Sequence, residues 1–211
     1  NDTGAYVKTV SFGGNANNLN GGLCTLPNNY LCAAGVFSAG FYEGTKRVSN
    51  NSKGLFIVAL DSSFVFKWRL IFSANKYFNC NLLCPDGKGN FFAAGYYSDS
   101  LNIGAKKYIA TNYKDSLDFK KDIFILHINQ NGVVLKTFTM GSYGNDYPTA
   151  LACDEDGNVI VGANISDTVM LGDMLYQQQS KSKAVLFKMS PNGNTFWITG
   201  LAGAGVIIGS L

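Results

Sequence analysis

The phrase NFFAAGYYS at residues 90–98 decides the fold of this chain, because it occurs three times. The other copies read NYLCAAGVFS from Asn29 and NVIVGANIS from Asn158. Each copy ends on a serine and is followed six residues later by a glycine (Ser38 and Gly44, Ser98 and Gly104, Ser166 and Gly172). A second phrase repeats in step, starting at residues 54, 122 and 183. Such periodicity is typical of one supersecondary unit that is stacked, because a single unit cannot bury its own apolar face.

Each copy is expected to contain four strands, which we name A to D in chain order. Strand A covers residues 21–26, 78–84 and 148–154, and its small residues fit a crowded inner position. Strand B is the first repeated phrase, and the second phrase supplies strands C and D. Turns rich in Asn, Asp and Gly join A to B and C to D. In the second copy, Phe124 and Ile125 begin alternating rows that are both largely apolar, so each sheet is expected to pack between neighbours.

We therefore predict an all-β protein of β-propeller-type blades, with three four-stranded antiparallel units and partial strands at both ends. The predicted boundaries are residues 1–14 for the last strand of a preceding blade, 15–75 for blade 1, 76–143 for blade 2, 144–203 for blade 3 and 204–211 for the start of a further blade. Closed propellers need about four blades or more. The chain is expected to be part of a larger propeller or to be completed by other chains.

The third unit carries a family resemblance. It reads GSYGNDYPTALACDEDGNVIVGANISDTVMLG over residues 141–172 and KAVLFKMSPNGNTFWITGLAG over residues 183–203. These motifs resemble the SBBP β-propeller repeat, and the likeness extends over nearly all of residues 5–203. The resemblance implies a propeller fold and a secreted or cell-surface location. It implies no shared catalytic site.

The connections between strands B and C, at residues 39–53, 99–121 and 167–183, form the most suggestive surface. They contain ten Lys or Arg and six Asp or Glu, a balance of +4 against +3 for the whole chain. Tyrosines among them can stack on sugars or on protein. An anionic polysaccharide or an acidic protein would fit such a surface, although lysines in long loops also serve solubility. The candidate binding residues are Lys46, Arg47, Lys106, Lys107, Tyr108, Tyr113 and Lys181.

No motif predicts a catalytic centre, a metal site or a cofactor. His127 is the single histidine, has no nucleophile motif beside it, and is expected to pack within strand C. The run DEDGN at residues 154–158 resembles the start of a calcium loop, but Ile165 stands where the loop needs its closing glutamate. A hairpin turn is therefore expected at these residues.

The chain has five cysteines, an odd number. Cys24, Cys84 and Cys153 are predicted at equivalent ends of strand A, which would place them too far apart for disulfides between blades. Cys24 and Cys32 are expected to face each other across a hairpin, either as a cross-strand disulfide or as packed thiols. Cys80 has no evident partner in the sequence.

The sequence thus predicts a non-catalytic scaffold or binding module, extracellular or at the cell surface. Its expected partners are proteins, further copies of itself or an anionic polysaccharide. Two alternatives stay open, a fragment of a propeller enzyme acting on polysaccharide and a subunit of a self-assembling surface filament or sheath. The net charge of +3 is too small to indicate nucleic acid. No apolar run approaches the roughly 18–20 residues of a membrane-spanning helix, and the chain, which begins at Asn1 without a leader-like segment, is expected to be processed or a fragment.

Overall fold

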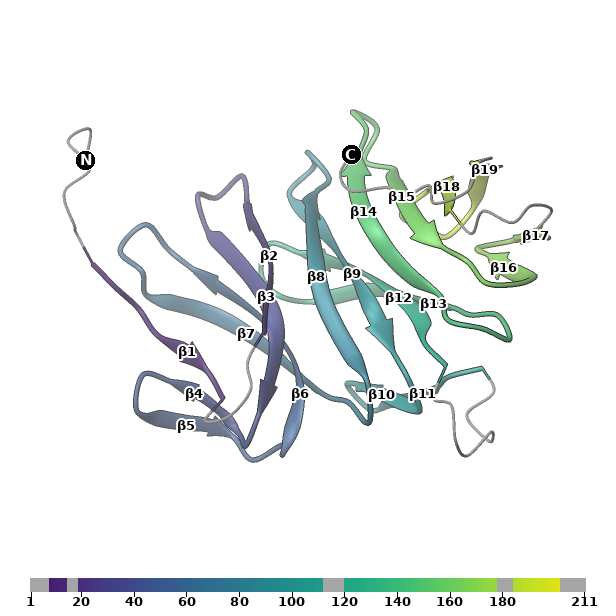
Figure 1. Ribbon diagram of the computed structural model, residues 1–211. Coiled ribbons are helices and arrows are strands. Elements are labelled where there is room, and N and C mark those ends of the chain that lie inside the picture. Colours follow the sequence, from purple (N-terminus) through teal and green to yellow (C-terminus); the bar gives the residue numbers. More distant parts are fainter. Residues whose placement is uncertain (1–7, 15–18, 112–119, 178–183, 202–211) are drawn as a thin grey trace.

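The computed structural model describes residues 8–14, 19–111, 120–177 and 184–201, and every regular element in these ranges is a β-strand. Three four-stranded antiparallel sheets follow one another along the chain and fan out side by side (Figure 1). Within each sheet, the four strands are hydrogen-bonded in the order A to D. The predicted all-β fold of propeller-like blades is therefore confirmed for the described residues.

Blade 1 consists of β2 (Leu19–Thr25), β3 (Leu31–Ser38), β6 (Lys53–Leu60) and β7 (Phe66–Ser73). Blade 2 consists of β8 (Phe78–Pro85), β9 (Asn90–Tyr97), β12 (Asp122–Asn129) and β13 (Val134–Met140). Blade 3 consists of β14 (Tyr147–Cys153), β15 (Val159–Asn164), β18 (Ala184–Met189) and β19 (Thr195–Gly200). The predicted partial strand at residues 204–211 lies outside the described residues.

Each B–C connection contains a short hairpin that the sequence analysis did not anticipate. The three hairpins are β4 (Phe41–Glu43) with β5 (Lys46–Ser49), β10 (Ser100–Ile103) with β11 (Lys106–Ile109), and β16 (Val169–Leu171) with β17 (Met174–Tyr176). Their turns use the repeated glycines Gly44, Gly104 and Gly172, whose φ angles are +58°, +59° and +64°. Such angles strain residues that carry a Cβ, so the recurring glycine was the hairpin signal in the sequence.

The repeated serine joins the end of strand B to the start of strand A. The hydroxyl of Ser98 donates to the carbonyl of Tyr77 at 3.1 Å, and the hydroxyl of Ser166 donates to the carbonyl of Asn145 at 2.7 Å. Both bonds close the same corner of the blade, which explains why this position repeats as serine.

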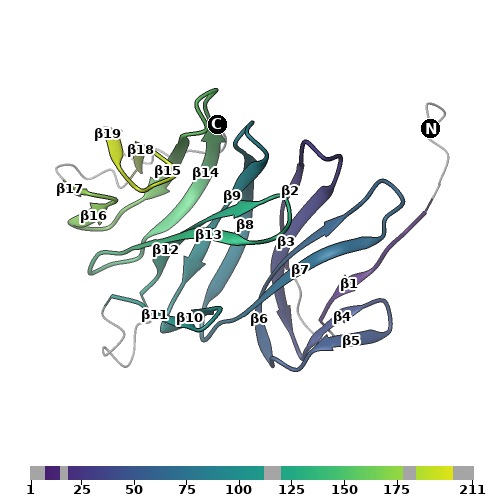
Figure 2. The same cartoon turned by 180° about the vertical axis from the view of Figure 1, so that it is seen from behind.

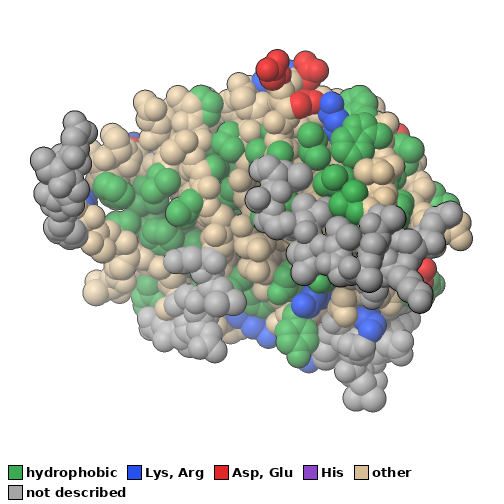
Figure 3. All heavy atoms as spheres, turned by 45° about the horizontal axis from the view of Figure 1, so that its top comes forward, with side chains coloured by type: hydrophobic (Ala, Val, Ile, Leu, Met, Phe, Trp, Pro, Cys, Tyr) green, Lys and Arg blue, Asp and Glu red, His purple; other side chains and the backbone are tan. Residues whose placement is uncertain are grey.

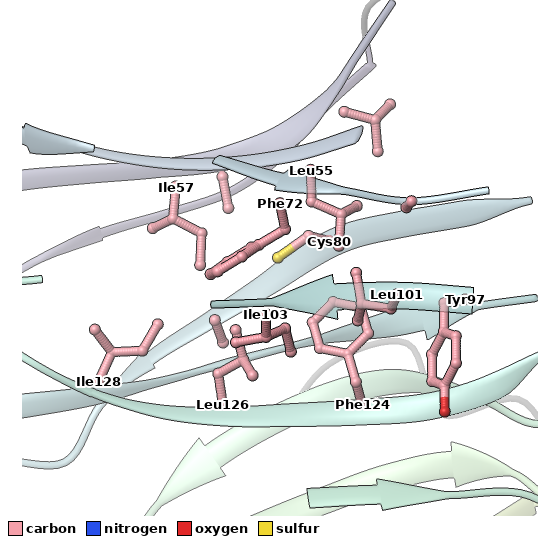
Figure 4. Close-up of a cluster of buried hydrophobic side chains, with 14 of the residues drawn as sticks. Leu55, Ile57, Phe72, Cys80, Tyr97, Leu101, Ile103, Phe124, Leu126 and Ile128 are labelled. Atoms are coloured by element: carbon pink, nitrogen blue, oxygen red, sulfur yellow. The ribbon is translucent and has the colours of Figure 1, made fainter. Parts of the chain in front are cut away.

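Both faces of blade 2 are buried against neighbours, as the two apolar rows of strand C predict. On one face, Phe91 and Phe124 pack with Leu55 and Ile57 of blade 1, and all four side chains are fully buried. Figure 4 shows this cluster, in which side chains of β12 point toward blade 1 and hairpin residues lie beside them. On the other face, residues such as Ile125 pack against blade 3. Burial of side chains of this size contributes about 1.5–3 kcal/mol each.

The backbones of strand A in blade 1 and strand A in blade 2 are in direct contact. A Cβ added at Gly21 would lie only 2.1 Å from the carbonyl oxygen of Cys80, and one at Gly22 would lie 2.9 Å from the amide nitrogen of Leu83. Only residues without a side chain permit this contact. The small residues of strand A thus occupy the crowded position that the sequence predicts.

Strand D of one blade also reaches the hairpin of the next. Ala74, directly after β7, forms a bridge with Leu101 of β10. The strand β1 (Phe12–Gly13) pairs with β4 in the matching register, with Phe12 opposite Glu43 and Gly13 opposite Tyr42. The strand β1 therefore pairs with the first hairpin in the same way as the end of β7 pairs with the second hairpin (Figures 1 and 2).

Candidate binding surface

The sheets have two chemically different ends. We call the end with the B–C hairpins the hairpin end, and the end with the A–B and C–D turns the turn end. In Figures 1 and 2 the hairpins β4–β5 and β10–β11 lie on the same side of the fan, opposite the turns. In Figure 3, a group of acidic side chains gathers at the upper edge, and Lys and Arg side chains appear toward the lower edge.

Two hairpins present a pair of basic residues at corresponding positions. Lys46 pairs in register with Glu43, and Lys106 pairs with Ile103, so each lysine opens the second strand of its hairpin. Arg47 and Lys107 follow directly. All four basic side chains are exposed to solvent. The structure thus brings two of the predicted basic pairs to the hairpin end.

Aromatic rings lie next to these cations. The ammonium group of Lys106 is 4.7 Å from the centroid of the Tyr108 ring, and the guanidinium carbon of Arg47 is 5.9 Å from that of Tyr42. Tyr108 is half-buried and packs against the core between blades 1 and 2. Its ring is therefore held in place while the charge beside it stays in water.

A groove of about 340 Å³ lies beside the second hairpin. Residues of β7, β10, β11 and β13 line it, among them Leu70, Tyr108 and Val134. The groove is mainly apolar, with Tyr108 at one side and the exposed basic pair of the same hairpin nearby in the chain. This arrangement offers an apolar surface next to positive charge.

The positive charge of these hairpins is poorly compensated. Glu43, the acid of the first hairpin, is held by Arg69, whose Nη2 donates to Oε2 at 2.9 Å. Within the described parts of the chain, no carboxylate forms an ion pair with Lys46, Lys106 or Lys107. These three ammonium groups are available to an anion from outside.

The third hairpin differs, because Met174 and Leu175 occupy the positions of the basic pairs. They are 40% and 65% exposed. The remaining predicted binding residues, Tyr113 and Lys181, lie outside the described residues. The basic surface that the structure describes is therefore formed by blades 1 and 2.

Two buried carboxyl groups at the hairpin end were not singled out from the sequence. Asp122 accepts a bond from the amide of Thr111 at 2.7 Å, while its Oδ1 has no partner among the described residues. Burial raises the pKa of Asp122 to about 6. Burial also raises the pKa of Asp146, although Ser142 and Ser166 donate hydrogen bonds to its carboxylate. Neither group is accessible enough to contact a polymer.

At the turn end, the buried Asp86 and the half-buried Asp154 are paired with basic side chains. His127 Nε2 lies 3.2 Å from Asp86 Oδ2, both side chains are buried, and the imidazole stacks on Phe92 at 4.5 Å between ring centroids. Burial opposes ionisation of Asp86, but bonds from Asn90, Lys88 and His127 outweigh it and lower the pKa of Asp86. His127 packs within strand C, as expected, and in addition has an acidic partner.

Blade 3 has the counterpart of this pair on its open face. Lys188 stands at the position of His127, and its Nζ lies 2.7 Å from Asp154 Oδ2. Bonds from Lys188 and Asn158 hold the pKa of Asp154 far below its usual range. The amide of Asn158 donates to Asp154 Oδ1 at 2.8 Å. This bond lies within the hairpin turn that the sequence predicts at these residues.

The predicted equivalence of Cys84 and Cys153 is wrong by one residue. Cys84 pairs with Phe92, whereas Cys153 pairs with Val159, the counterpart of Phe91. Since successive residues of a strand point to opposite faces, the two cysteines point in opposite directions relative to their own sheets. Cys24 and Cys32 are opposite each other in register, as predicted, and are free thiols.

Comparison with known proteins supplies no family. No protein-family model matches the chain, and no curated protein shows significant similarity to it. The resemblance to the SBBP repeat therefore rests on the sequence motifs alone. The described residues contain no helix of the length and apolarity needed to cross a membrane, and no group of three or more His, Cys, Asp or Glu arranged to hold a metal ion.

Proposed function

We propose that this protein is a non-catalytic binding module that is secreted or exposed at the cell surface and binds an anionic polysaccharide through its first two hairpins. The observation that carries the proposal is the set of exposed, uncompensated ammonium groups on Lys46, Lys106 and Lys107 next to a fixed tyrosine. The SBBP-type motifs support the extracellular location. Membership of that repeat family is part of the proposal.

The chemistry of the hairpins suits a carboxylated or sulfated sugar chain. The apolar face of a sugar ring can lie against Tyr108 and the groove wall, while its anionic groups contact the lysines. Exposed ion pairs contribute only about 0.2–1 kcal/mol each. Useful affinity therefore needs several contacts along one polymer, which the two basic hairpins of blades 1 and 2 would provide together.

The exposed charges of the described hairpins are suited to binding and not to bond cleavage. Hydrolysis of a glycosidic bond uses two carboxyl groups that flank the bond, roughly 5–10 Å apart. Tyr108 and Thr137 are the lining residues of the groove with polar side chains, and Lys106 lies against the Tyr108 ring. We therefore assign them the role of holding a polymer in place.

A binding measurement with charge variants tests the proposal. Isothermal titration with a sulfated polysaccharide, a carboxylated one and a neutral one should give binding to the anionic polymers only. The double variant Lys106→Gln/Lys107→Gln should bind about tenfold more weakly, because loss of two exposed contacts costs about 1.4 kcal/mol in total. Binding should also weaken with added salt, since these charges are screened.

The matched control is Lys67→Gln/Lys136→Gln, which removes the same charge from exposed positions on β7 and β13 near the turn end. Its affinity should equal that of the unmodified protein. Equal binding by both double variants, or equal binding of the neutral polymer, would contradict the proposal.

A further inference from the structure

Cys84 and Cys153 face each other across the interface between blades 2 and 3. Cys84 is paired with Phe92, whose side chain belongs to the core between these blades, so Cys84 points toward blade 3. Cys153 is paired with Val159, which lies in the same core from the other side, so Cys153 points toward blade 2. Residues that are paired across an antiparallel ladder lie on the same face of the sheet. The orientation of both cysteines therefore follows from the strand register.

The two blades are also in close contact at this height. The Sγ atom of Cys153 lies 3.9 Å from the carbonyl oxygen of Cys84. Just beyond, the ammonium group of Lys88 donates to the carbonyl of Asp156 at 2.6 Å, and a Cβ at Gly157 would stand 3.4 Å from the carbonyl oxygen of Asp86. The two A–B turns thus touch, and the thiols lie directly beneath this contact.

We propose that Cys84 and Cys153 are a redox-active pair that forms a disulfide and joins strand A of blade 2 to strand A of blade 3. Both side chains are partly accessible, so a small oxidant can reach them. The oxidant is a low-molecular-weight disulfide of the glutathione class.

The environment assigns a role to each thiol. A hydrogen bond from the Cys153 thiol lowers the pKa of Cys84, while donation of that bond raises the pKa of Cys153. The Cys84 thiolate therefore attacks one sulfur of oxidised glutathione, and the first glutathione leaves as a thiolate. The Cys153 sulfur, losing its proton, attacks the Cys84 sulfur of the mixed disulfide and releases the second glutathione. The two cysteines lose two electrons and two protons in total, which reduce one oxidised glutathione to two thiols.

The other cysteines give internal references. Cys80 is fully buried, and burial raises its pKa to about 12, so it should stay unreactive. Cys24 and Cys32 belong to one hairpin of blade 1, where a bond would join strands that are already neighbours. The bond between blades closes about 70 residues of chain and constrains the unfolded state much more.

Peptide mapping under non-reducing conditions tests the connectivity. The folded protein is equilibrated with oxidised and reduced glutathione, free thiols are blocked, and cross-linked peptides are sequenced by tandem mass spectrometry. A peptide joining Cys84 to Cys153, with a loss of about 2 Da for the bond, is expected. A bond from Cys84 to Cys24, or Cys84 recovered only as the blocked thiol, would overturn the proposal.

The thermal effect tests the bond between blades independently. Oxidation should raise the Tm by about 10 °C relative to the same protein with reductant. Cys84→Ser and Cys153→Ser should each abolish this difference, and the Cys24→Ser/Cys32→Ala variant should retain it. Because each variant is compared with itself under oxidising and reducing conditions, a general loss of stability does not affect the result. A difference that persists in Cys153→Ser would contradict the assignment.

Discussion

The pKa values of two buried acids, one at the turn end and one at the hairpin end of the sheets, shift in opposite directions. At the turn end, Asp86 has a lowered pKa, because its two oxygens accept hydrogen bonds from Lys88, Asn90 and His127. At the hairpin end, Asp122 is equally shielded from solvent but is hydrogen-bonded by Thr111 alone, and burial raises its pKa to about 6. Both side chains are 2% exposed, so burial alone does not decide the charge of a carboxyl group. Depth of burial, hydrogen-bond donors and neighbouring charges act together, since Asp146 accepts bonds from Ser142 and Ser166 and its pKa is nevertheless raised by burial.

The contrast extends to the surface. At the turn end, carboxylates such as Asp154 have partners within the chain. At the hairpin end, the exposed lysines of the first two hairpins have no ion-pair partner among the described residues. The buried and half-buried acids of the turn end, Asp86 and Asp154, thus have partners within the chain, whereas Glu155 and Asp156 beside them are exposed and form no ion pair among the described residues. The described part of the hairpin end differs in the sign of its unpaired charge, which comes from lysines. Three substitutions test this comparison.

The largest expected effect is that of Asp86→Ala. The change removes the acceptor of the Lys88 and Asn90 amides and leaves His127 without its acidic partner. We expect a loss of about 3 kcal/mol in the free energy of unfolding, measured by urea denaturation at pH 7, because buried donors that lose their acceptor cost about 1–3 kcal/mol each. Asp154→Ala, at the corresponding turn of blade 3, is the matched control and should cost less because Asp154 is only half-buried. Equal losses would remove the distinction between the two turns.

Asp122→Asn should instead stabilise the protein at neutral pH. The folded protein holds a proton on Asp122 up to about pH 6, whereas the unfolded chain releases it near pH 3.8. Stability from this group is therefore present below about pH 4 and is lost as the pH rises to about 6. A difference of about two pKa units corresponds to roughly 3 kcal/mol, so we expect a gain of up to about 3 kcal/mol at pH 8 and none at pH 3.5.

Urea denaturation of Asp122→Asn and the unmodified protein across pH 3.5–8 measures this gain. The decline in stability between about pH 4 and pH 6 should be smaller in the variant. Identical profiles would show that Asp122 is ionised in the folded protein at low cost, and the contrast between the two ends would fail.

The smallest effect comes from comparing His127→Ala with Lys188→Ala. The two residues stand at corresponding positions of strand C, but His127 is buried between blades and Lys188 lies on an open face. Loss of the buried hydrogen bond and of the stacking on Phe92 should cost about 2 kcal/mol. Lys188→Ala should lower the Tm less than His127→Ala does, because the half-buried Lys188–Asp154 pair lies on an open face of blade 3 that water reaches. Thermal denaturation followed by circular dichroism measures both, and a larger shift for Lys188→Ala would contradict the expectation.

The sequence predicted the large elements because they carry long, repeated signals. The alternating apolar rows around Phe124 and Ile125 determine both buried faces of blade 2. The hairpins were missed because their strands are only three or four residues long, too short for a periodic pattern, although Gly104 and its counterparts indicated the turns.

Partners that are distant in sequence were also missed. Asp86 and His127 are 41 residues apart. Blade 3 has Asp154 and Lys188 at the corresponding positions, but blade 1 has Leu26 and Ala59, so the pair does not repeat in all three units. Lys106 and Lys107 were singled out because the B–C connections contain an excess of basic residues, which can be counted in the sequence without knowledge of the hairpins. The face of the sheet to which Cys153 points depends on the register of β14. A register shift of one residue reverses that face, and the sequence alone does not determine it.

The bridge between Ala74 and Leu101 has a consequence for how such arrays are dissected. The last residues of strand D pair with the hairpin of the following blade. A segment that begins at strand A therefore does not contain every strand that its own hairpin needs for pairing. A segment excised from β8 to β13 would lose the neighbour that orders its own hairpin. A segment that also includes the closing residues of β7 should be the smallest piece of this repeat in which the hairpin of blade 2 keeps its conformation.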